Sequence, residues 1–589
     1  RIESLVEGIP AEERSDSLEF TTESGWADWR TEFGATMAVE GEGVSVGFPD
    51  GAAMLVNPAL DARISGQPYV SLDISSPTAE YAELIFVTEV GSGTAMIPVT
   101  PTQRTSIVNM LTHPMWRGKL RLLGLSLPGS DPSSATIEGL WLSDKPRGKP
   151  FVYVRSLAPG RAVMRSGRDE QVIAVLRNLA AEASDIEATL RAPEGVRVLG
   201  KRRKSVPSLA YGGTRSIEWT VRADGPGPRT CELALSVNGA QIERRELPVV
   251  FEPPARQAKA SYVPRPEPVE PDYLTLMHYC PLWKQGTHYG WQRIEPWPER
   301  KPAIGWYDEG TPEVADWQIK YALEHGIQGF IYCWYRKDFS PEITQNLGYA
   351  IHDGLLNAKY LDQFRFTIMW ENGCAKGIES RDDMMENLLP YWIENYFTHP
   401  SYVVIDNKPL LYVWRPERLS PEVGGSGPTR ELLDEMRDEL KRHGFDGLYI
   451  VGCVSTANEA LLNQMAEEGW DASSAYAVWG ETDAEREFDV EGIPTLDHRE
   501  CSLGQEKIWR GKKAIGALPD IPTVMMGWDP RPWHGGQTSR YQAEASPENF
   551  REACLKARKL LEETPGNGLD KRIVAFDNWN EFGEGHYLE

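Results

Sequence analysis

The chain has 589 residues, enough for about three domains at roughly 100–200 residues each. Its formal net charge of −24 argues against nucleic acid or an anionic membrane as a partner, because phosphate binding needs clustered Lys and Arg side chains. No apolar run reaches the roughly 18 residues of a membrane-spanning helix, so no membrane span is predicted.

The seven cysteines are scattered, without a CxxC pair or a neighbouring His at metal-ligand spacing. His278, His534 and His586 are equally isolated. We therefore expect mostly buried free thiols, no metal and no cofactor. The chain begins at Arg1, which fits a removed export signal and a shortened chain equally well. We expect a secreted or periplasmic protein, although a cytoplasmic location stays open. The sequence does not predict the oligomeric state.

Residues 1–150 contain short alternations of apolar and polar residues between Gly, Pro and Ser clusters, such as YVSLDIS at 69–75. This spacing predicts an all-β sandwich. The architecture resembles the galactose-binding-like jelly-roll modules attached to many polysaccharide-degrading enzymes. Trp26, Trp29 and Trp116 are its candidate sugar platforms, although packing in the core is the simpler role for each.

A second β-rich series occupies residues 151–253 and has the length and strand spacing of an immunoglobulin-like β-sandwich. We interpret it as a spacer. Residues 254–271 are rich in Pro and poor in apolar residues, which predicts a semi-rigid linker.

The pattern changes in residues 272–589, where apolar runs alternate with amphipathic helical stretches, as in repeated βα units. Eight runs predict the strands of a (β/α)8 TIM barrel: 273–280, 329–336, 364–372, 409–415, 447–454, 473–480, 522–529 and 572–581. The clearest helices are expected at 312–326, 429–444, 458–469 and 546–563. Only eight residues follow the last strand, so the eighth helix is absent, removed or replaced by an upstream segment.

The ends of these strands and the loops beside them are rich in aromatic and polar residues. Active sites of TIM barrels lie at the C-terminal ends of the strands. Sugar sites combine aromatic faces with a few polar groups. The candidate substrate contacts are His278, Tyr279, Trp306, Tyr307, Asp308, Trp334, Tyr335, Trp370, Glu371, Asn372, Trp414, Arg415, Tyr476, Trp479, Trp528, Asp529, Trp533 and Asn580. For Glu371, an ion pair with Arg336 or Arg415 is the alternative role.

Two carboxylates follow the last strand in the sequence NWNEFGEGHYLE at 578–589. The glycine between Glu581 and Glu584 lets the backbone turn and direct both side chains into one pocket. Glycoside cleavage needs such a pair, because one group protonates the leaving oxygen and a second assists attack on the anomeric carbon. We therefore expect Glu581 and Glu584 to be catalytic. Surface ion pairs are the alternative.

The segment Asn580-Glu581-Phe582-Gly583-Glu584-Gly585 matches the Asn-Glu-aromatic-x-Glu-Gly signature of glycoside hydrolase family 99 endo-α-mannosidases and of related WbsX-like proteins. Many of the latter carry the name glycosyltransferase. Other segments resemble this family in the same order, and together they span essentially the whole barrel: 305–336, 369–372, 408–416 and 524–532.

The resemblance implies that Glu581 is the base on the sugar 2-hydroxyl and that Glu584 is the acid, which later activates water. The reaction would then pass through a 1,2-anhydro sugar with net retention. Its substrate must hold the 2-oxygen anti to the leaving group, as α-manno and α-rhamno sugars do. Phe582-Gly583 replaces a Trp-His common in the mannosidases, and strand three lacks the usual Ala before its Asn-Glu pair, so the identity of the sugar stays open.

The favoured function is therefore a retaining glycoside hydrolase acting on a polysaccharide or oligosaccharide. A WbsX-like glycosyltransferase of polysaccharide biosynthesis is the first alternative, although neither a DxD-like acidic pair after a strand nor a Gly-rich loop opening a helix is present. A non-catalytic carbohydrate-binding protein is the second alternative. It would keep the aromatic residues without needing both Glu581 and Glu584.

Overall fold

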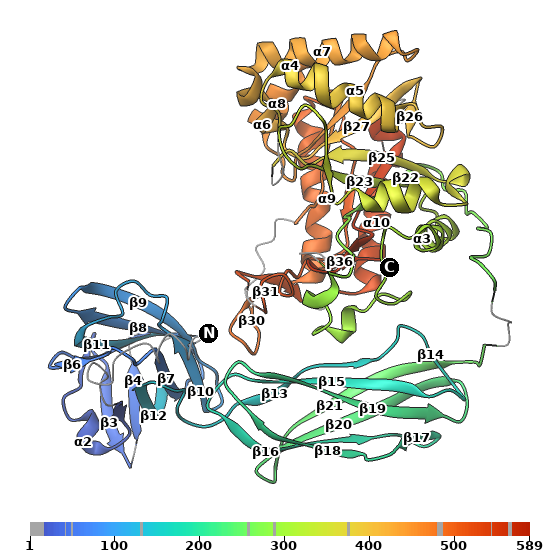
Figure 1. The fold of residues 1–589 in the computed structure, drawn as a ribbon. Coiled ribbons are helices and arrows are strands. Elements are labelled where there is room, and N and C mark those ends of the chain that lie inside the picture. Colours follow the sequence, from blue (N-terminus) through green and yellow to red (C-terminus); the bar gives the residue numbers. More distant parts are fainter. Residues whose placement is uncertain are drawn as a thin grey trace. The chain divides into compact units, whose positions relative to one another are not determined.

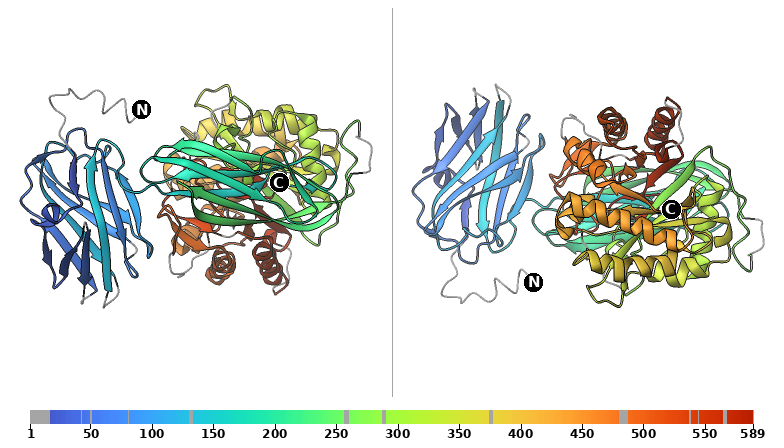
Figure 2. Two further views of the ribbon diagram at one scale, coloured as in Figure 1. Left: turned by 90° about the horizontal axis from the view of Figure 1, so that it is seen from below. Right: turned by 90° about the horizontal axis from the view of Figure 1, so that it is seen from above.

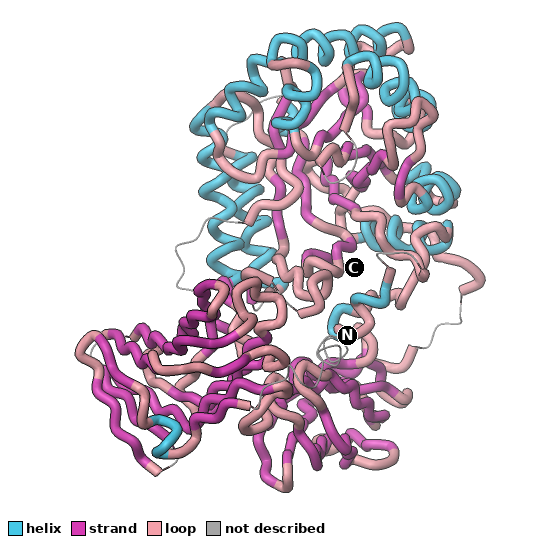
Figure 3. The backbone as a smooth tube through the Cα atoms, turned by 60° about the vertical axis from the view of Figure 1, so that its left-hand side comes forward, coloured by secondary structure: helices cyan, strands magenta, loops and turns pink. Residues whose placement is uncertain are grey.

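The computed structural model describes residues 17–588 except 42, 49–50, 80, 130–132, 256–259, 287–289, 374–376, 480–486, 537, 544 and 564–567. The chain divides into two compact units (Figure 1). One unit is Arg1–Ala255 with Val490–Gly492, and the other is Arg256–Asp489 with Ile493–Glu589. Strands dominate the first unit, whereas helices gather in the second (Figure 3).

The first unit begins with a sandwich of two six-stranded antiparallel sheets, ordered β10-β7-β12-β4-β3 with β1 beside β12, and β2-β5-β11-β8-β9 with β6 beside β11. Alternate residues of their strands form one shared core. Trp26, Trp29 and Trp116 are buried in this core, so they pack and do not form an exposed sugar platform. The elements are β1 Leu18–Phe20, α2 Glu23–Trp26, β2 Arg30–Glu32, β3 Thr36–Glu40, β4 Gly43–Phe48, β5 Ala52–Asn57, β6 Ala62–Arg63, β7 Tyr69–Ser75, β8 Tyr81–Thr88, β9 Gly91–Pro98, β10 Arg104–Asn109, β11 Lys119–Pro128 and β12 Ser133–Ser143.

A second sandwich follows in the same unit. Its sheets have the orders β13-β15-β19-β17 and β14-β21-β20-β16-β18, and all their pairs are antiparallel except β14 with β21. Trp219 and Cys231 lie in the core between the sheets. The strands are β13 Val152–Pro159, β14 Met164–Arg165, β15 Glu170–Asn178, β16 Ala183–Arg191, β17 Val196–Leu199, β18 Arg203–Leu209, β19 Thr214–Ala223, β20 Gly227–Val237 and β21 Ala240–Glu252.

The second unit is built on eight parallel strands ordered β29-β28-β27-β25-β23-β22-β34-β32. A bridge between Ser473 of β29 and Asp520, just before β32, joins the two ends, so the sheet is a nearly closed barrel. Each of the eight strands lies inside its predicted run or begins one residue before it, and several end short of the run. They are β22 Leu274–Tyr279, β23 Gly329–Arg336, β25 Arg365–Trp370, β27 Lys408–Val413, β28 Tyr449–Cys453, β29 Ala472–Ser474, β32 Thr523–Met525 and β34 Ile573–Asp577.

Helices surround these strands (Figure 2). The four predicted helices are present as α3 Pro312–Glu324, α7 Ser426–Arg442, α8 Glu459–Glu468 and α10 Pro547–Glu562, and each presents buried apolar residues to the barrel. Further helices that we did not predict are α4 Arg381–Asp383, α5 Leu389–Trp392, α6 Pro416–Val423 and α9 His498–Ile515, with π-helical turns at Ala350–Gly354, Met384–Leu388 and Ile393–Phe397. Among the described residues, no helix is both long and apolar enough to cross a membrane.

The described chain continues after β34 as a hairpin and not as an eighth helix. Its strands β35 (Asn580–Glu581) and β36 (His586–Tyr587) pair antiparallel, with Glu581 opposite His586. The connecting turn contains Gly585, whose φ of 75° favours glycine. This hairpin carries both predicted catalytic carboxylates.

Candidate active site

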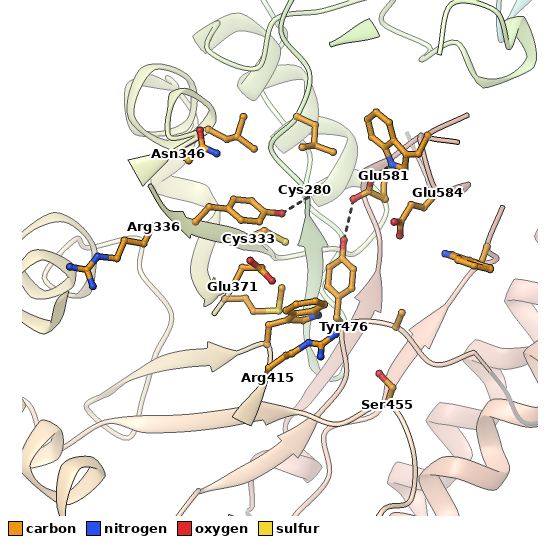
Figure 4. Close-up of a pocket in the computed structure, with 18 of the residues that line it drawn as sticks. Cys280, Cys333, Arg336, Asn346, Glu371, Arg415, Ser455, Tyr476, Glu581 and Glu584 are labelled. Carbon is orange, nitrogen blue, oxygen red and sulfur yellow. Dashed lines mark hydrogen bonds between the residues drawn. The ribbon is translucent and has the colours of Figure 1, made fainter. Parts of the chain in front are cut away.

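A cavity of about 890 Å³ lies at the C-terminal ends of the barrel strands. Glu581 and Glu584 lie side by side at its wall (Figure 4). Gly583 between them packs closely, because a Cβ there would lie 1.9 Å from Cε2 of Trp533. A larger residue at this position would displace the Trp533 ring, which explains why this chain has glycine there.

Glu581 is buried and accepts hydrogen bonds from neutral side chains. Tyr476 donates its hydroxyl proton to Oε2 over 3.3 Å, and the Trp533 indole N–H donates to Oε1 over 3.4 Å. Trp533 itself stacks on Trp283 with ring centroids 5.7 Å apart. Burial, followed by the negative charge of Glu584, raises the pKa of Glu581 to about 7. This carboxyl group can therefore hold a proton near neutral pH.

Glu584 has a cationic neighbour. Its Oε2 lies 3.1 Å from Nε2 of His586. Burial opposes its ionisation, but the hydrogen bond and charge of His586 outweigh burial, so the pKa of Glu584 lies below its usual value. The pKa values of these two carboxyl groups are thus shifted in opposite directions. Such a difference is the usual basis for dividing acid and base roles between two carboxyl groups.

His586 connects Glu584 to a third carboxylate. Its Nδ1 lies 2.9 Å from both carboxylate oxygens of Asp577, the last residue of β34. The side chains of His586 and Asp577 are fully buried. Burial lowers the pKa of His586, but the charge and hydrogen bond of Asp577, together with Glu584, raise it well above its usual value. The sequence did not predict these two carboxylate partners of His586.

Ten of the predicted residues line the cavity. Besides the two carboxylates, they are Tyr335, Glu371, Trp414, Arg415, Tyr476, Trp479, Trp528 and Trp533. The alternative role predicted for Glu371 was an ion pair with Arg336 or Arg415. The Arg336 guanidinium pairs with Asp383 at 2.6 Å, and the Arg415 guanidinium lies 3.8 Å from Glu417. In Figure 4 the Arg336 side chain points away from the carboxylates.

Trp334 and Trp370, predicted at the mouth, are buried outside the cavity. Side chains alternate along a strand. Cys333 and Tyr335 therefore face the cavity, while Trp334 between them donates its indole N–H to the Tyr396 hydroxyl over 3.1 Å. Trp370 packs against Trp392 in the same helical layer. Their place in the outer core does not support a direct sugar contact.

The other predicted contacts also lie outside the cavity lining. Their described contacts hold neighbouring segments in place. His278 lies 3.1 Å from the carbonyl oxygen of Ala475, Tyr279 donates to Gln318, and Asn580 donates to Glu309. Trp306 packs on Trp291, and the Tyr307 carbonyl oxygen accepts from the Trp291 indole. Asp308 forms an ion pair with Lys284, Asp529 pairs with Arg300 and Arg531, and the Asn372 side chain bonds to the backbone N–H and carbonyl of Arg415.

Several lining residues were not predicted as contacts, among them Cys280, Cys333, Arg293 and His534. The two cysteines were interpreted as packing residues, as their burial also indicates. The strand alternation, counted from Tyr335, is the signal that would have placed Cys333 at the cavity. Among the described residues, no group of three or more His, Cys, Asp or Glu side chains is arranged to hold a metal.

Residues 297–589 match the model of the family described as Glycosyltransferase WbsX, which confirms the resemblance of the C-terminal region to that family. A relative from Xanthomonas campestris pv. campestris, "Uncharacterized protein WxcX", is 24% identical over 315 residues, covering 49% of this chain and 41% of the relative. Its counterpart from strain B100 is 23% identical over the same length. The chain thus spans less than half the length of the curated relatives it matches.

Two solved structures show likeness at low identity. The GH99 endo-alpha-mannosidase from Bacteroides thetaiotaomicron has a TM-score of 0.37 and 14% identity, covering 53% of this chain and 86% of that chain. A calcium-binding mutant of Bacteroides uniformis beta-glucuronidase 2 has a TM-score of 0.29 and 11% identity, covering 91% of this chain and 61% of that chain.

Proposed function

We propose that the barrel unit is a retaining glycoside hydrolase that cleaves α-linked manno- or rhamno-configured bonds in a polysaccharide. The observation that carries the proposal is the pair Glu581 and Glu584, a buried and a half-buried carboxyl group of one cavity whose pKa values are shifted in opposite directions. Such a pair supplies an acid and a base at the same pH. A secreted or periplasmic site of action suits this substrate and belongs to the proposal.

The cavity walls suit a sugar chain. Trp479 and Trp528 lie 5.1 Å apart between ring centroids, tilted by 32°, and both are half-buried. Their accessible faces can stack on the apolar faces of pyranose rings. N-terminal to this catalytic barrel at 272–589 in the sequence, we propose a galactose-binding-like module at 1–150, an immunoglobulin-like spacer at 151–253 and the linker at 254–271.

The reaction we propose has two steps. In the first step, one carboxylate removes the 2-hydroxyl proton while the 2-oxygen bonds to the anomeric carbon, and the other carboxyl group gives its proton to the departing oxygen. In the second, water adds to the anomeric carbon as its bond to the 2-oxygen breaks. The water proton goes to the former acid, and the former base returns its proton to the 2-oxygen. The two inversions give net retention.

A glycosyltransferase is the second candidate, and one observation favours it. The basic side chains Arg293, Lys337 and Arg415 line the cavity, where they could bind the diphosphate of a nucleotide sugar. The hydrolase remains the better-supported proposal because the two carboxylates account for bond cleavage without a nucleotide.

A substrate screen tests the proposal. Purified protein is incubated with α-mannans, rhamnans and sulfated polysaccharides, and the first-formed product anomer is followed by proton NMR. We expect cleavage with an α product, and a drop of ~10²–10⁴ in rate for Glu581→Gln combined with Glu584→Gln. A β product first would contradict retention. Transfer of the mannosyl group from GDP-mannose to an acceptor hydroxyl with release of GDP, without hydrolysis, would favour the transferase. Sugar binding that the double variant leaves unaffected, without cleavage, would favour a non-catalytic protein.

A further inference from the structure

Glu309 is a buried carboxylate that does not line the cavity but joins two segments beside it. It lies in the loop before α3 and is 2% exposed. Its Oε1 accepts from the Asn580 amide over 2.7 Å, and its Oε2 accepts from the Trp283 backbone N–H over 2.9 Å. We infer that Glu309 is a positioning residue of the reaction, which acts through Asn580 to hold Glu581 at the cavity wall. This inference rests on the proposed function.

Asn580 directly precedes Glu581 in β35, and both polar atoms of its side chain have partners. Its Nδ2 donates to Glu309, and its Oδ1 accepts from the Cys280 backbone N–H over 2.9 Å. Because a backbone N–H can only donate, Oδ1 must face Cys280, and Nδ2 is left for Glu309. The Asn580 carbonyl oxygen also accepts from the Trp283 indole N–H over 2.7 Å. Side chain and backbone of Asn580 are therefore both fixed.

Glu309 is itself held at its backbone. Its N–H donates to the Trp283 carbonyl oxygen over 3.1 Å, so Trp283 contacts both the backbone and the carboxylate of Glu309. Gly354 packs directly against the same loop, because a Cβ there would lie 2.2 Å from the Glu309 carbonyl oxygen. A residue fixed in this way can impose its position on the groups that it binds.

The network continues the seam between the first and the last barrel strand. The ladder of β22 and β34 ends at Met277 and Phe576. Beyond the ladder, the Trp579 N–H donates to the His278 carbonyl oxygen over 2.8 Å, and the contacts of Asn580 come next along the chain. The network therefore fixes the start of the hairpin against the chain after β22.

The position of Glu581 matters for the proposed reaction. A carboxyl group exchanges a proton with its substrate only within hydrogen-bond reach, about 2.6–3.2 Å. A misplacement of about 1 Å caused by a distant substitution can cost ~10²-fold in rate. Hydrogen bonds to a carboxylate are also stronger than those between neutral groups, which suits Glu309 to fix its neighbour. A purely structural Glu309 would affect stability alone.

Exchanging the two side-chain groups separates positioning from packing. In Glu309→Gln, the new amide faces one of two donors, and in Asn580→Asp two carboxylates face each other. In Glu309→Gln combined with Asn580→Asp, the new amide can donate to the new carboxylate and still accept from Trp283. The new carboxylate still accepts from Cys280, so the double variant keeps every hydrogen bond with one polarity reversed.

Kinetics on polysaccharide give the first readout. We expect each single variant to lower kcat by ~10–10²-fold, because Glu581 leaves its productive position. KM should stay within about threefold, because the cavity contacts that bind substrate are intact. The double variant should recover most of the lost kcat. Single variants with wild-type kcat overturn the inference, and so does a double variant no more active than the weaker single variant.

Crystal structures give a readout that is independent of turnover. In the present structure Glu581 accepts from Tyr476 over 3.3 Å and from Trp533 over 3.4 Å. Glu309→Gln should displace Glu581 from these donors, and the double variant should restore both contacts. An unmoved Glu581 in Glu309→Gln overturns the inference even if kcat falls. If wild-type protein cleaves no substrate, the proposed function fails, while these structures still decide whether Glu309 positions Glu581.

Glu468→Gln is the matched control. Glu468 is 1% exposed in the barrel unit, accepts from the Trp470 indole over 2.9 Å and from Gln464 over 2.8 Å, and does not line the cavity. This variant should lower Tm and leave kcat and KM unchanged. If Glu309→Gln shows the same result, Glu309 only stabilises the fold and the inference is wrong. If Glu309→Gln does not fold, Asn580→Asp and the double variant carry the same test.

Discussion

The tryptophans of the first sandwich and those at the barrel mouth differ in their exposure. In the first sandwich Trp26 and Trp29 are at most 4% exposed and pack on each other with centroids 5.2 Å apart. At the barrel mouth Trp414, Trp479 and Trp528 are half-buried and face the cavity. A ring that is covered on all sides can only stabilise the fold, whereas a ring with one free face can also bind. Residue type alone did not separate these roles.

The largest expected effect is on stability. Trp26→Ala should destabilise the first sandwich by about 3–5 kcal/mol, because it removes a fully buried ring and leaves a cavity. Differential scanning calorimetry should show one transition moving to lower temperature. Activity on polysaccharide below that transition should be unchanged, since the barrel belongs to a separate compact unit. A lowered kcat for the folded variant would break the comparison.

The sequence was sufficient to predict the barrel because each strand is a short apolar run bounded by turn signals. All eight runs contain strands, and the four helices predicted from amphipathic patterns are present. The direction of single side chains was harder to predict. Trp334 and Trp370 lie near the ends of their strands beside Tyr335 and Glu371, but a shift of one residue turns a side chain from the cavity to the helices.

The contacts of His586 with Asp577 and Glu584 were not predicted, for a different reason. Asp577 and His586 are nine residues apart, and only the hairpin of β35 and β36 brings the imidazole back to the end of β34. The pairing of Glu581 with His586 across this hairpin depends on the turn at Gly583 and Gly585. The sequence contains these glycines, but it does not predict the register of the strand pairing that they produce.

The second expected effect concerns a buried carboxylate in each unit. Glu581 in the barrel has neutral donors, whereas the buried Glu170 in the second sandwich accepts from Arg168 at 2.7 Å. Because the folded pKa of Glu581 is raised, its contribution to stability is present below pH 4.5 and is lost as pH rises through about 7. Glu581→Gln should therefore stabilise the barrel by about 1–3 kcal/mol at pH 8 and have little effect at pH 5.

Chemical unfolding of the wild type and the variant at both pH values measures this difference. Glu170→Gln is the control, and it should destabilise at pH 8, because it weakens a buried, charge-assisted hydrogen bond. A loss of stability for Glu581→Gln at pH 8 would show that contacts other than the neutral donors stabilise the ionised Glu581 carboxylate.

The smallest expected effect is on substrate binding. Trp479→Ala removes one face of the aromatic pair at the cavity, and an aromatic contact of this kind contributes about 0.5–1.5 kcal/mol. We therefore expect KM for polysaccharide to rise about 2–10-fold, with kcat nearly unchanged, because Trp479 contacts neither carboxylate in the described hydrogen bonds.

Phe33 is the counterpart in the first sandwich, where it is 72% exposed. Phe33→Ala should leave KM and retention on a polysaccharide affinity gel unchanged, because a single exposed ring offers no cavity to a sugar chain. If Phe33→Ala weakened retention as much as Trp479→Ala, the first sandwich would bind the polymer through its surface, and the division of roles between the two units would not hold.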